Sequence, residues 1–446
     1  MKKLIAVLIA AMLFGAACTA GGGGNSTPPK AVSTGGSHKP VTLTVWDYFT
    51  ERELSNLKDV LNQFSKQYPW IHINLVPGKS FSDYVRGITS GQTIDVAIDP
   101  GPDNVAKYCA TGAFQNLGPY IQSSGLDMTK TFPPAALKYT SYKGTQCTLP
   151  LLTDAYGLYY NKDMFAAAHI SGPPKTLSEF QADARKLTKF NPDGSIKVAG
   201  FVPLSTFYEN ANLYNGLPWG TTWYTAAGKS AFATDPMWAQ MMQWAKSQIG
   251  FFHGYDNLQK FFSKLGGPNS EWSSAQAFEN GEVAMAFDGE WRSSFIQNDK
   301  AKINYGTAPF PTADNKTQLY GAGQVGGTVI GIPKTSAHPN EAWALVSFLA
   351  TNTKALDTLA ELLKNVPTTY ASLKDPKLVN DPHFKPFLEI FQNPNSRFYP
   401  LTTAGTAAAD DLDAFVAKWQ AGNVSSLSQG LKQLANQVDQ QLQLGG

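Results

Sequence analysis

Residues 41–76 decide the fold class of this chain, and they run VTLTVWDYFTERELSNLKDVLNQFSKQYPWIHINLV. Residues 41–45 alternate between apolar and polar side chains with a period of two, which predicts a strand. Apolar residues then recur at helical spacing as far as Tyr68, and Pro69 ends that helix. Residues 71–75 alternate again and predict a second strand. A strand, a helix and a strand in this order indicate an α/β fold with a parallel sheet.

The alternation of strands and helices continues beyond this stretch. Residues 81–90 predict a helix, and residues 94–98 predict a short buried strand. A second unit begins near residue 155, where residues 176–179 form a capping box ahead of an amphipathic helix. Residues 271–280 predict a later helix. About 400 residues follow the N-terminal segment, which is enough for two domains or one bilobed unit.

The N-terminal segment predicts export and lipid attachment. Residues 4–17 are apolar or small and follow two lysines, and this run is shorter than the about 20 residues of a membrane-spanning helix. We therefore assign residues 1–17 to a signal peptide. The small residues before Cys18 resemble a bacterial lipobox, although Gly15 stands where the pattern usually has Leu. Residues 18–40 are rich in Gly, Ser and Pro, so we expect a lipidated Cys and a flexible tether.

Charge and composition narrow the class of ligand. Without the two lysines of the signal peptide, basic and acidic residues number 34 each. This balance argues against a nucleic-acid partner, which a basic excess would indicate, and against a polyanionic ligand. Aromatic residues make up 12% of the chain and include ten Trp. Such residues fill cores, and they also stack against the C–H faces of sugars.

Cysteine and histidine usage predicts no metal site and no cofactor. After Cys18, only Cys109 and Cys147 remain, and in an oxidising compartment they could form a disulfide or stay two separate buried thiols. The six His residues have no metal-ligand spacing. A phosphate-binding loop, a nucleophile elbow and a dinucleotide fingerprint are all missing from the sequence.

Three stretches in a fixed order carry a family resemblance. They are GLYYNKDMF at residues 157–165, FENGEVAMAFDGEW at residues 278–291 and GGTVIGI at residues 326–332. Together they resemble the family 1 extracellular solute-binding proteins, the relatives of maltose-binding protein, over residues 41–446. The resemblance implies a periplasmic-binding-protein-like type II fold. In that fold two α/β lobes are joined by a multi-segment hinge, and the ligand lies in the cleft between them.

The resemblance also implies that each lobe is discontinuous in sequence. Residues 41–153 and 325–368 would form the N-terminal lobe, and residues 154–324 and 369–446 would form the C-terminal lobe.

Candidate ligand contacts follow from the resemblance and from residue chemistry. Asp154 falls where relatives carry a sugar-binding carboxylate, which can accept hydrogen bonds from neighbouring hydroxyls; the alternative is an Asp that caps the hinge. Trp291 aligns with a sugar-stacking Trp, and the alternative is a core Trp at a helix start. Gly327 would let a crossing segment bend and approach the ligand.

Further candidates lie at sheet-edge loops and in an aromatic stretch. Trp46 and Asp47 follow the first strand, and Asp103, or in its place Asp99, follows the third. Open α/β sheets bind ligands at such positions; solvated turn residues are the alternative. Tyr208, Trp219 and Trp223 belong to an aromatic-rich stretch, of which we expect at least one ring to face the cleft.

The function expected from these observations is capture without chemistry. The protein would be the extracytoplasmic, lipid-anchored component of an ABC importer, binding a di- or oligosaccharide as a monomer and delivering it to the transmembrane permease subunits. One alternative is a binding protein for another solute, such as a polyamine or ferric ion. A second is a secreted glycoside hydrolase that uses two carboxylates from among Asp154, Asp288 and Glu290.

Overall fold

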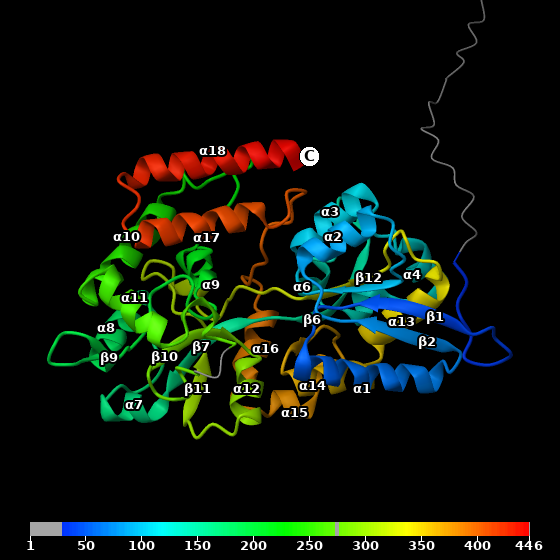
Figure 1. Ribbon diagram of the computed structural model, residues 1–446, viewed down its shortest axis with the longest axis horizontal. Helices are drawn as coiled ribbons and strands as arrows, with labels where there is room; N and C mark the ends of the chain where they lie inside the picture. Colours follow the sequence, from blue (N-terminus) through cyan, green and yellow to red (C-terminus); the bar gives the residue numbers. More distant parts are fainter. Residues whose placement is uncertain (1–28, 273–275, 446) are drawn as a thin grey trace, which may run out of the picture.

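The computed structural model describes residues 29–272 and 276–445. The predicted signal peptide, Cys18 and the first part of the tether lie outside the described residues. Two lobes lie side by side, each with its own sheet and helices (Figure 1). Within the described part of the chain, no helix is long and apolar enough to cross a membrane.

The first lobe contains a six-stranded sheet in the order β13-β6-β12-β3-β1-β2. Its strands are β1 (Val41–Trp46), β2 (Ile71–Val76), β3 (Val96–Asp99), β6 (Thr148–Thr153), β12 (Thr328–Gly331) and β13 (Val366–Pro367). β1 pairs in parallel with both β2 and β3, as the sequence predicts. The parallel prediction was made for the strands of residues 41–98, and for these it is confirmed. β12 runs antiparallel to β3 and β6, and β13 runs antiparallel to β6, so the sheet as a whole is mixed. These strands enter the sheet from distant parts of the chain, which no local pattern reveals.

Helices cover both faces of this sheet. They are α1 (Glu51–Gln67), α2 (Phe81–Thr89), α3 (Val105–Thr111), α4 (Gly118–Ser124), α5 (Met128–Thr131), α6 (Pro134–Leu137), α13 (Pro339–Thr351) and α14 (Thr353–Leu363). A 3₁₀ turn (Pro102–Asn104) and a hairpin of β4 (Ser141–Tyr142) and β5 (Thr145–Gln146) complete the lobe. α1 buries Leu57, Val60 and Phe64, which follow the helical spacing of its sequence. Cys109 and Cys147 form a disulfide in this lobe.

The second lobe is built around a three-stranded antiparallel sheet in the order β10-β7-β11. Its strands are β7 (Tyr156–Asn161), β10 (Met285–Gly289) and β11 (Tyr305–Ala308), with a hairpin of β8 (Lys189–Phe190) and β9 (Ile196–Val198). Around them lie α7 (Lys162–Ala167), α8 (Leu177–Leu187), α9 (Ala211–Tyr214), α10 (Pro236–Phe251), α11 (Tyr255–Lys264) and α12 (Arg292–Asn298).

The C-terminal part of the chain adds α15 (Pro376–Val379), α16 (Lys385–Gln392), α17 (Ala407–Gln420) and α18 (Leu427–Gly445). Four 3₁₀ turns lie at Leu217–Trp219, Gly267–Asn269, Thr317–Leu319 and Ser372–Lys374. α17 and α18 run along the top of the second lobe in Figure 1. The predicted capping box of α8 is confirmed, because the Glu179 amide donates to the Thr176 hydroxyl and the Thr176 amide donates to the Glu179 carboxylate, both at 3.2 Å.

The helix predicted for residues 271–280 is wrong. Of the described residues, 271–272 and 277–281 form turns, and Gln276 has a left-handed φ of 43°. Tertiary partners take the backbone groups of this region: the Phe278 amide donates to the Tyr208 hydroxyl at 3.4 Å, and the Glu271 carbonyl accepts from Arg292 at 3.0 Å. A local sequence pattern carries no information about such tertiary hydrogen bonds, so it predicts a helix here that does not form.

Candidate functional site

Three chain segments pair side by side where the lobes meet. Ala155 and Val325 form an antiparallel bridge, and the Gly326 amide donates to the Asp154 carbonyl at 2.9 Å. A third segment joins in parallel, because the Val325 amide donates to the Arg397 carbonyl at 2.9 Å. We call these three segments, which include residues 154–156, 324–326 and 397, the crossing ribbon. Its hydrogen bonds place residues from very different parts of the sequence at one point between the lobes.

A buried polar network lies beside the crossing ribbon. The Asn365 amide group donates to the Asp154 carboxyl at 2.8 Å and to the Glu290 carboxyl at 2.9 Å. The other oxygen of Glu290 accepts from the Ala155 backbone amide at 2.8 Å. Glu290 follows β10 of the second lobe, and Asn365 immediately precedes β13 of the first lobe. The network therefore ties both lobes to the predicted ligand residue Asp154.

Both carboxyl groups of this network hold their protons more tightly than usual. Burial raises the pKa of Asp154, and the charge of Glu53 raises it further, while the hydrogen bond from Asn365 acts in the opposite direction. Burial also raises the pKa of Glu290, followed by the charge of Asp154. A carboxyl that keeps its proton can donate a hydrogen bond as well as accept one, which suits a ligand that carries hydroxyl groups.

An aromatic surface adjoins the network. Tyr156, the first residue of β7, meets the ring of Trp291 edge-on with ring centroids 5.6 Å apart. The ring of Trp272 lies nearly parallel to that of Trp291, at 6.3 Å and 16°, and Trp272 is 61% exposed. The indole N–H of Trp291 donates to the Glu271 carboxylate at 3.1 Å, which fixes the orientation of the ring. The structure thus brings Trp291 close to Asp154 through Tyr156 and Glu290.

A buried arginine, Arg292, follows Trp291 directly and fixes its position. Arg292 donates to Asp288 at 2.6 Å and to Glu279 at 3.1 Å, and its guanidinium lies 4.6 Å from the centre of the Tyr208 ring. Burial lowers the pKa of Arg292, but the charges of Asp288 and Glu279 outweigh this effect and raise it above its ordinary value. The guanidinium therefore stays charged and holds the start of α12, and with it Trp291, in place.

Two predicted contacts of the first lobe are placed in its interior. Trp46 packs against Tyr84 and against Gly87, where an added Cβ would lie 2.5 Å from the indole. Asp47 is fully buried, and its carboxyl accepts from the Phe49 amide at 2.9 Å. Burial raises the pKa of Asp47 to about 7. The structure does not bring these two side chains to the polar network, so their ligand role stays a prediction.

The remaining predicted contacts are spread over both lobes. Asp103 lies in the 3₁₀ turn after β3, where burial, and after it the charge of Asp410 on α17, raises the pKa of Asp103 to about 6. Tyr208 is buried beneath Arg292, and Trp219 is buried edge-on against Trp244. Their roles as ligand contacts stay predictions.

Gly327 meets a requirement that only glycine fulfils without strain. Its φ is 148°, and an added Cβ would lie 2.7 Å from the Leu152 carbonyl oxygen. This close approach joins the crossing ribbon to β6 and β12.

Sequence reasoning misses several residues of this region. Arg292 follows the quoted motif directly and stands four residues after Asp288, a spacing that could have suggested the ion pair. Asn365 and Tyr156 have no local signal, because only the pairing of the crossing segments brings them to Asp154.

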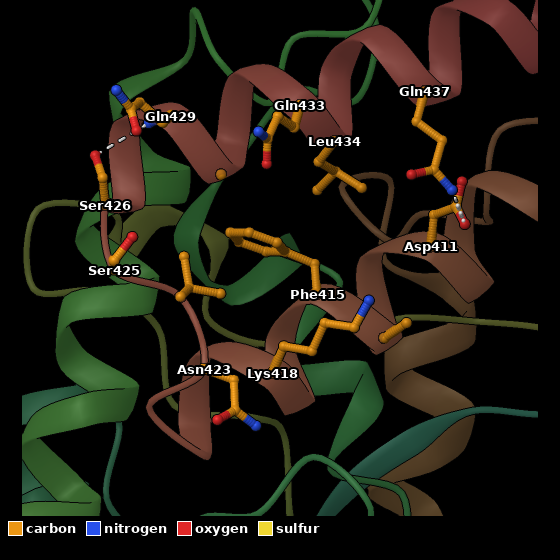
Figure 2. A pocket seen from close by; sticks show the side chains of 13 residues that line it. Asp411, Phe415, Lys418, Asn423, Ser425, Ser426, Gln429, Gln433, Leu434 and Gln437 are labelled. Carbon is orange, nitrogen blue, oxygen red and sulfur yellow. Dashed lines mark hydrogen bonds between the residues drawn. The ribbon is translucent and has the colours of Figure 1, made fainter.

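A pocket with a volume of about 310 Å³ lies elsewhere, between α17 and α18 (Figure 2). Phe415 and Leu434 supply its apolar lining. The Asp411 carboxylate at its edge already accepts hydrogen bonds from Gln437 and Gln441, both at 2.7 Å. This pocket involves none of the crossing segments.

Over the described ranges, no group of three or more His, Cys, Asp or Glu residues is placed to hold a metal ion.

Comparisons with known proteins agree with this architecture. The structure called CpMnBP1 with mannotriose bound superimposes with a TM-score of 0.79 and 25% sequence identity, covering 89% of this chain and 99% of that chain. The maltotriose-binding protein of Pyrococcus abyssi is 22% identical over 80% of this chain and 72% of its own length. The maltooligosaccharide ABC transporter solute-binding lipoprotein of Streptococcus pneumoniae R6 is 23% identical over 70% of this chain and 69% of its own length.

These findings define the class of the protein. Its fold is that of the type II periplasmic binding proteins, in which two α/β lobes joined by several chain segments enclose a ligand cleft. The family model for bacterial extracellular solute-binding proteins matches residues 49–355. The chain belongs to that family, whose members bind solutes outside the cytoplasm.

Proposed function

We propose that the protein is the substrate-binding component of an ABC importer, and that it captures a sugar of two or more units and delivers it to the membrane permease. One observation carries the proposal: the aromatic surface of Trp291, Tyr156 and Trp272 adjoins the Asp154–Asn365–Glu290 network at the crossing ribbon. Flat rings offer apolar area to the C–H faces of a sugar, and the network offers donors and acceptors to its hydroxyls. The names of the relatives, which bind maltotriose, maltooligosaccharides or mannotriose, support a sugar.

The proposal includes closure of the lobes and a place at the membrane. Residues 41–153 with 325–368 and residues 154–324 with 369–446 would move as two lobes about the crossing segments. Cys18 would carry the lipid anchor, and residues 19–40 would tether a monomeric binding protein to the outer face of the membrane. A Cys18→Ala variant that stays in the membrane fraction of the cell would contradict the anchor. The protein would bind its ligand without chemical change.

Thermal unfolding tests the ligand class. Residues 40–446 would be heated with maltose, maltotriose, mannobiose, mannotriose, spermidine or ferric citrate at increasing concentrations. A ligand that binds only the folded state stabilises it by about 2.7 kcal/mol at one hundred times its Kd. We expect the melting temperature to rise with at least one sugar and to stay unchanged with spermidine and ferric citrate.

Two results would contradict the proposal. A shift with spermidine or ferric citrate, and none with any sugar, would replace the ligand class while leaving the fold. Release of reducing ends from the sugars above a blank would indicate a glycoside hydrolase instead.

A further inference from the structure

Several polar side chains lie on one face of the crossing ribbon. Side chains alternate between the faces of paired extended segments. An added Cβ at Gly326 would lie 3.6 Å from the Tyr156 hydroxyl and 3.8 Å from Asp154, so these residues share one face. Gln324, two residues before Gly326, points to that same face. Arg397 is the direct partner of Gln324 in the parallel bridge, so its side chain lies there as well.

A pocket with a volume of about 250 Å³ opens beside Gln324 and Arg397. Trp223, Tyr224 and Thr221 of the second lobe form its other wall. Ligand pockets for drug-sized molecules start near 300 Å³, so this space suits a single ring rather than a whole oligosaccharide. Its place on the ribbon face of Asp154 and Tyr156 makes it an extension of the proposed sugar site.

Two side chains of this pocket, Gln324 and Arg397, are incompletely paired among the described residues. Gln324 is only 3% exposed, and within the described part of the chain its side-chain nitrogen has no hydrogen-bond partner. A buried amide without a partner is destabilising, so such a group points to a ligand or water that would pair with it. Arg397 donates to the Thr221 carbonyl at 2.9 Å, and no carboxylate among the described residues forms an ion pair with it. The pocket therefore presents unused donors.

The pocket combines donors with an aromatic wall. Hydroxyl oxygens of a sugar can accept hydrogen bonds from Arg397 and Gln324. The ring of Trp223 offers apolar area to the same unit, and Tyr399 meets that ring edge-on at 5.5 Å.

We propose that the pocket between Gln324, Arg397 and Trp223 is a subsite for one sugar unit, next to the unit that contacts Trp291. This inference rests on the proposed function. It predicts that chain length is recognised at this pocket, so that the protein binds a trisaccharide more tightly than the matching disaccharide.

Calorimetric titration with paired ligands tests the subsite. Maltose is compared with maltotriose, and mannobiose with mannotriose, on the soluble protein and on the variants Arg397→Met and Gln324→Leu. Loss of a hydrogen bond to a charged donor weakens binding by roughly 10- to 100-fold. We expect Arg397→Met to weaken trisaccharide binding by that factor and to leave disaccharide binding within about twofold. Gln324→Leu is expected to act in the same direction with a smaller effect, because its donor is neutral.

Control variants separate the possible outcomes. Arg86→Met removes an exposed arginine of the first lobe and should preserve the preference for three units. A preference that survives both pocket substitutions, or equal affinity of the unmodified protein for the two chain lengths, would overturn the subsite. Failure of the unmodified protein to bind any of the sugars would instead overturn the proposed function. Melting temperatures of the variants without ligand show whether they fold.

Discussion

At the scale of single residues, Trp291 is held by contacts rather than by its local chain. Its indole N–H is bonded to Glu271, its ring stands edge-on to Tyr156, and it is only 9% exposed. Arg292, the next residue, is fixed by two carboxylates, which prevents the start of α12 from rotating. A ring that is oriented before the ligand arrives loses little entropy on binding.

Replacing Trp291 tests this arrangement. We expect Trp291→Ala to weaken sugar binding about tenfold or more, because it removes the apolar ring of the proposed site, and Trp291→Phe to weaken it less. Isothermal titration calorimetry measures the affinities. Trp70→Ala, which removes a partly buried Trp stacked on His38 in the first lobe, should leave affinity unchanged. Unaltered affinity in Trp291→Ala would show that Trp291 is a core residue only.

At the scale of elements, the crossing ribbon is the part of the structure that connects the lobes. Its segments exchange backbone hydrogen bonds, and the Asn365 amide joins β13 to both Asp154 and Glu290. Paired segments resist independent twisting, so closure of the lobes would bend them together. Adjacent glycines in one of these segments have different surroundings and can be tested as a matched pair.

Gly327→Ala and Gly326→Ala are expected to act on different properties. At Gly327 the positive φ is strained for alanine, and the new Cβ would collide with the Leu152 carbonyl oxygen. Gly327→Ala should therefore lower the free energy of unfolding by about 2 kcal/mol or more. At Gly326 the nearest atoms to a Cβ lie 3.6 Å away or farther, which is ordinary contact. Gly326→Ala should therefore keep stability but weaken sugar binding, because its methyl group faces Asp154 and Tyr156. Urea unfolding and calorimetry measure the two effects, and equal stabilities would refute the strain assigned to Gly327.

At the scale of the whole molecule, one hydrophobic cluster passes through the hinge. It contains Leu43 and Ile98 of the first lobe, Val325 of the crossing ribbon, and Tyr159 and Phe278 of the second lobe. Several carboxyl groups around this core are buried, and burial is the main cause that raises their pKa values. Asp47 and Asp99 of the first lobe and Asp413 of the second each reach about 7.

These carboxyl groups make stability depend on pH. In the unfolded chain an Asp has a pKa near 4, so between about pH 4 and pH 7 the folded state binds more protons than the unfolded state. The free energy of unfolding should therefore fall as the pH rises, and this contribution is lost as the pH passes through about 7. We expect the melting temperature to be several degrees lower at pH 8 than at pH 5.5. Asp99→Asn should reduce that difference, whereas a melting temperature that rises over this range would contradict the assignment.

Much of the fold was accessible from the sequence, and much of the site was not. The strands and helices of residues 41–99 are found near their predicted positions, because their apolar spacing reflects which face each buries. Over its described residues the stretch 271–280 forms turns instead of the expected helix, and Tyr208 and Arg292 bond two of its backbone groups. Trp46 and Asp47 were predicted at a sheet edge, but their side chains lie inside the first lobe. The periodicity of a strand shows which face a side chain is on, but not how deeply other elements cover that face.

The sequence by itself determined the family, through three motifs in order, and the succession of strands and helices, because both depend on residues that are close along the chain. Only the tertiary structure decided which distant side chains meet. Asp154 meets Glu290 and Asn365, and Gln324 meets Arg397, since several crossings of the chain between the lobes bring these positions together. The protonation of buried carboxyl groups was decided there too, because it follows from the loss of water around each group.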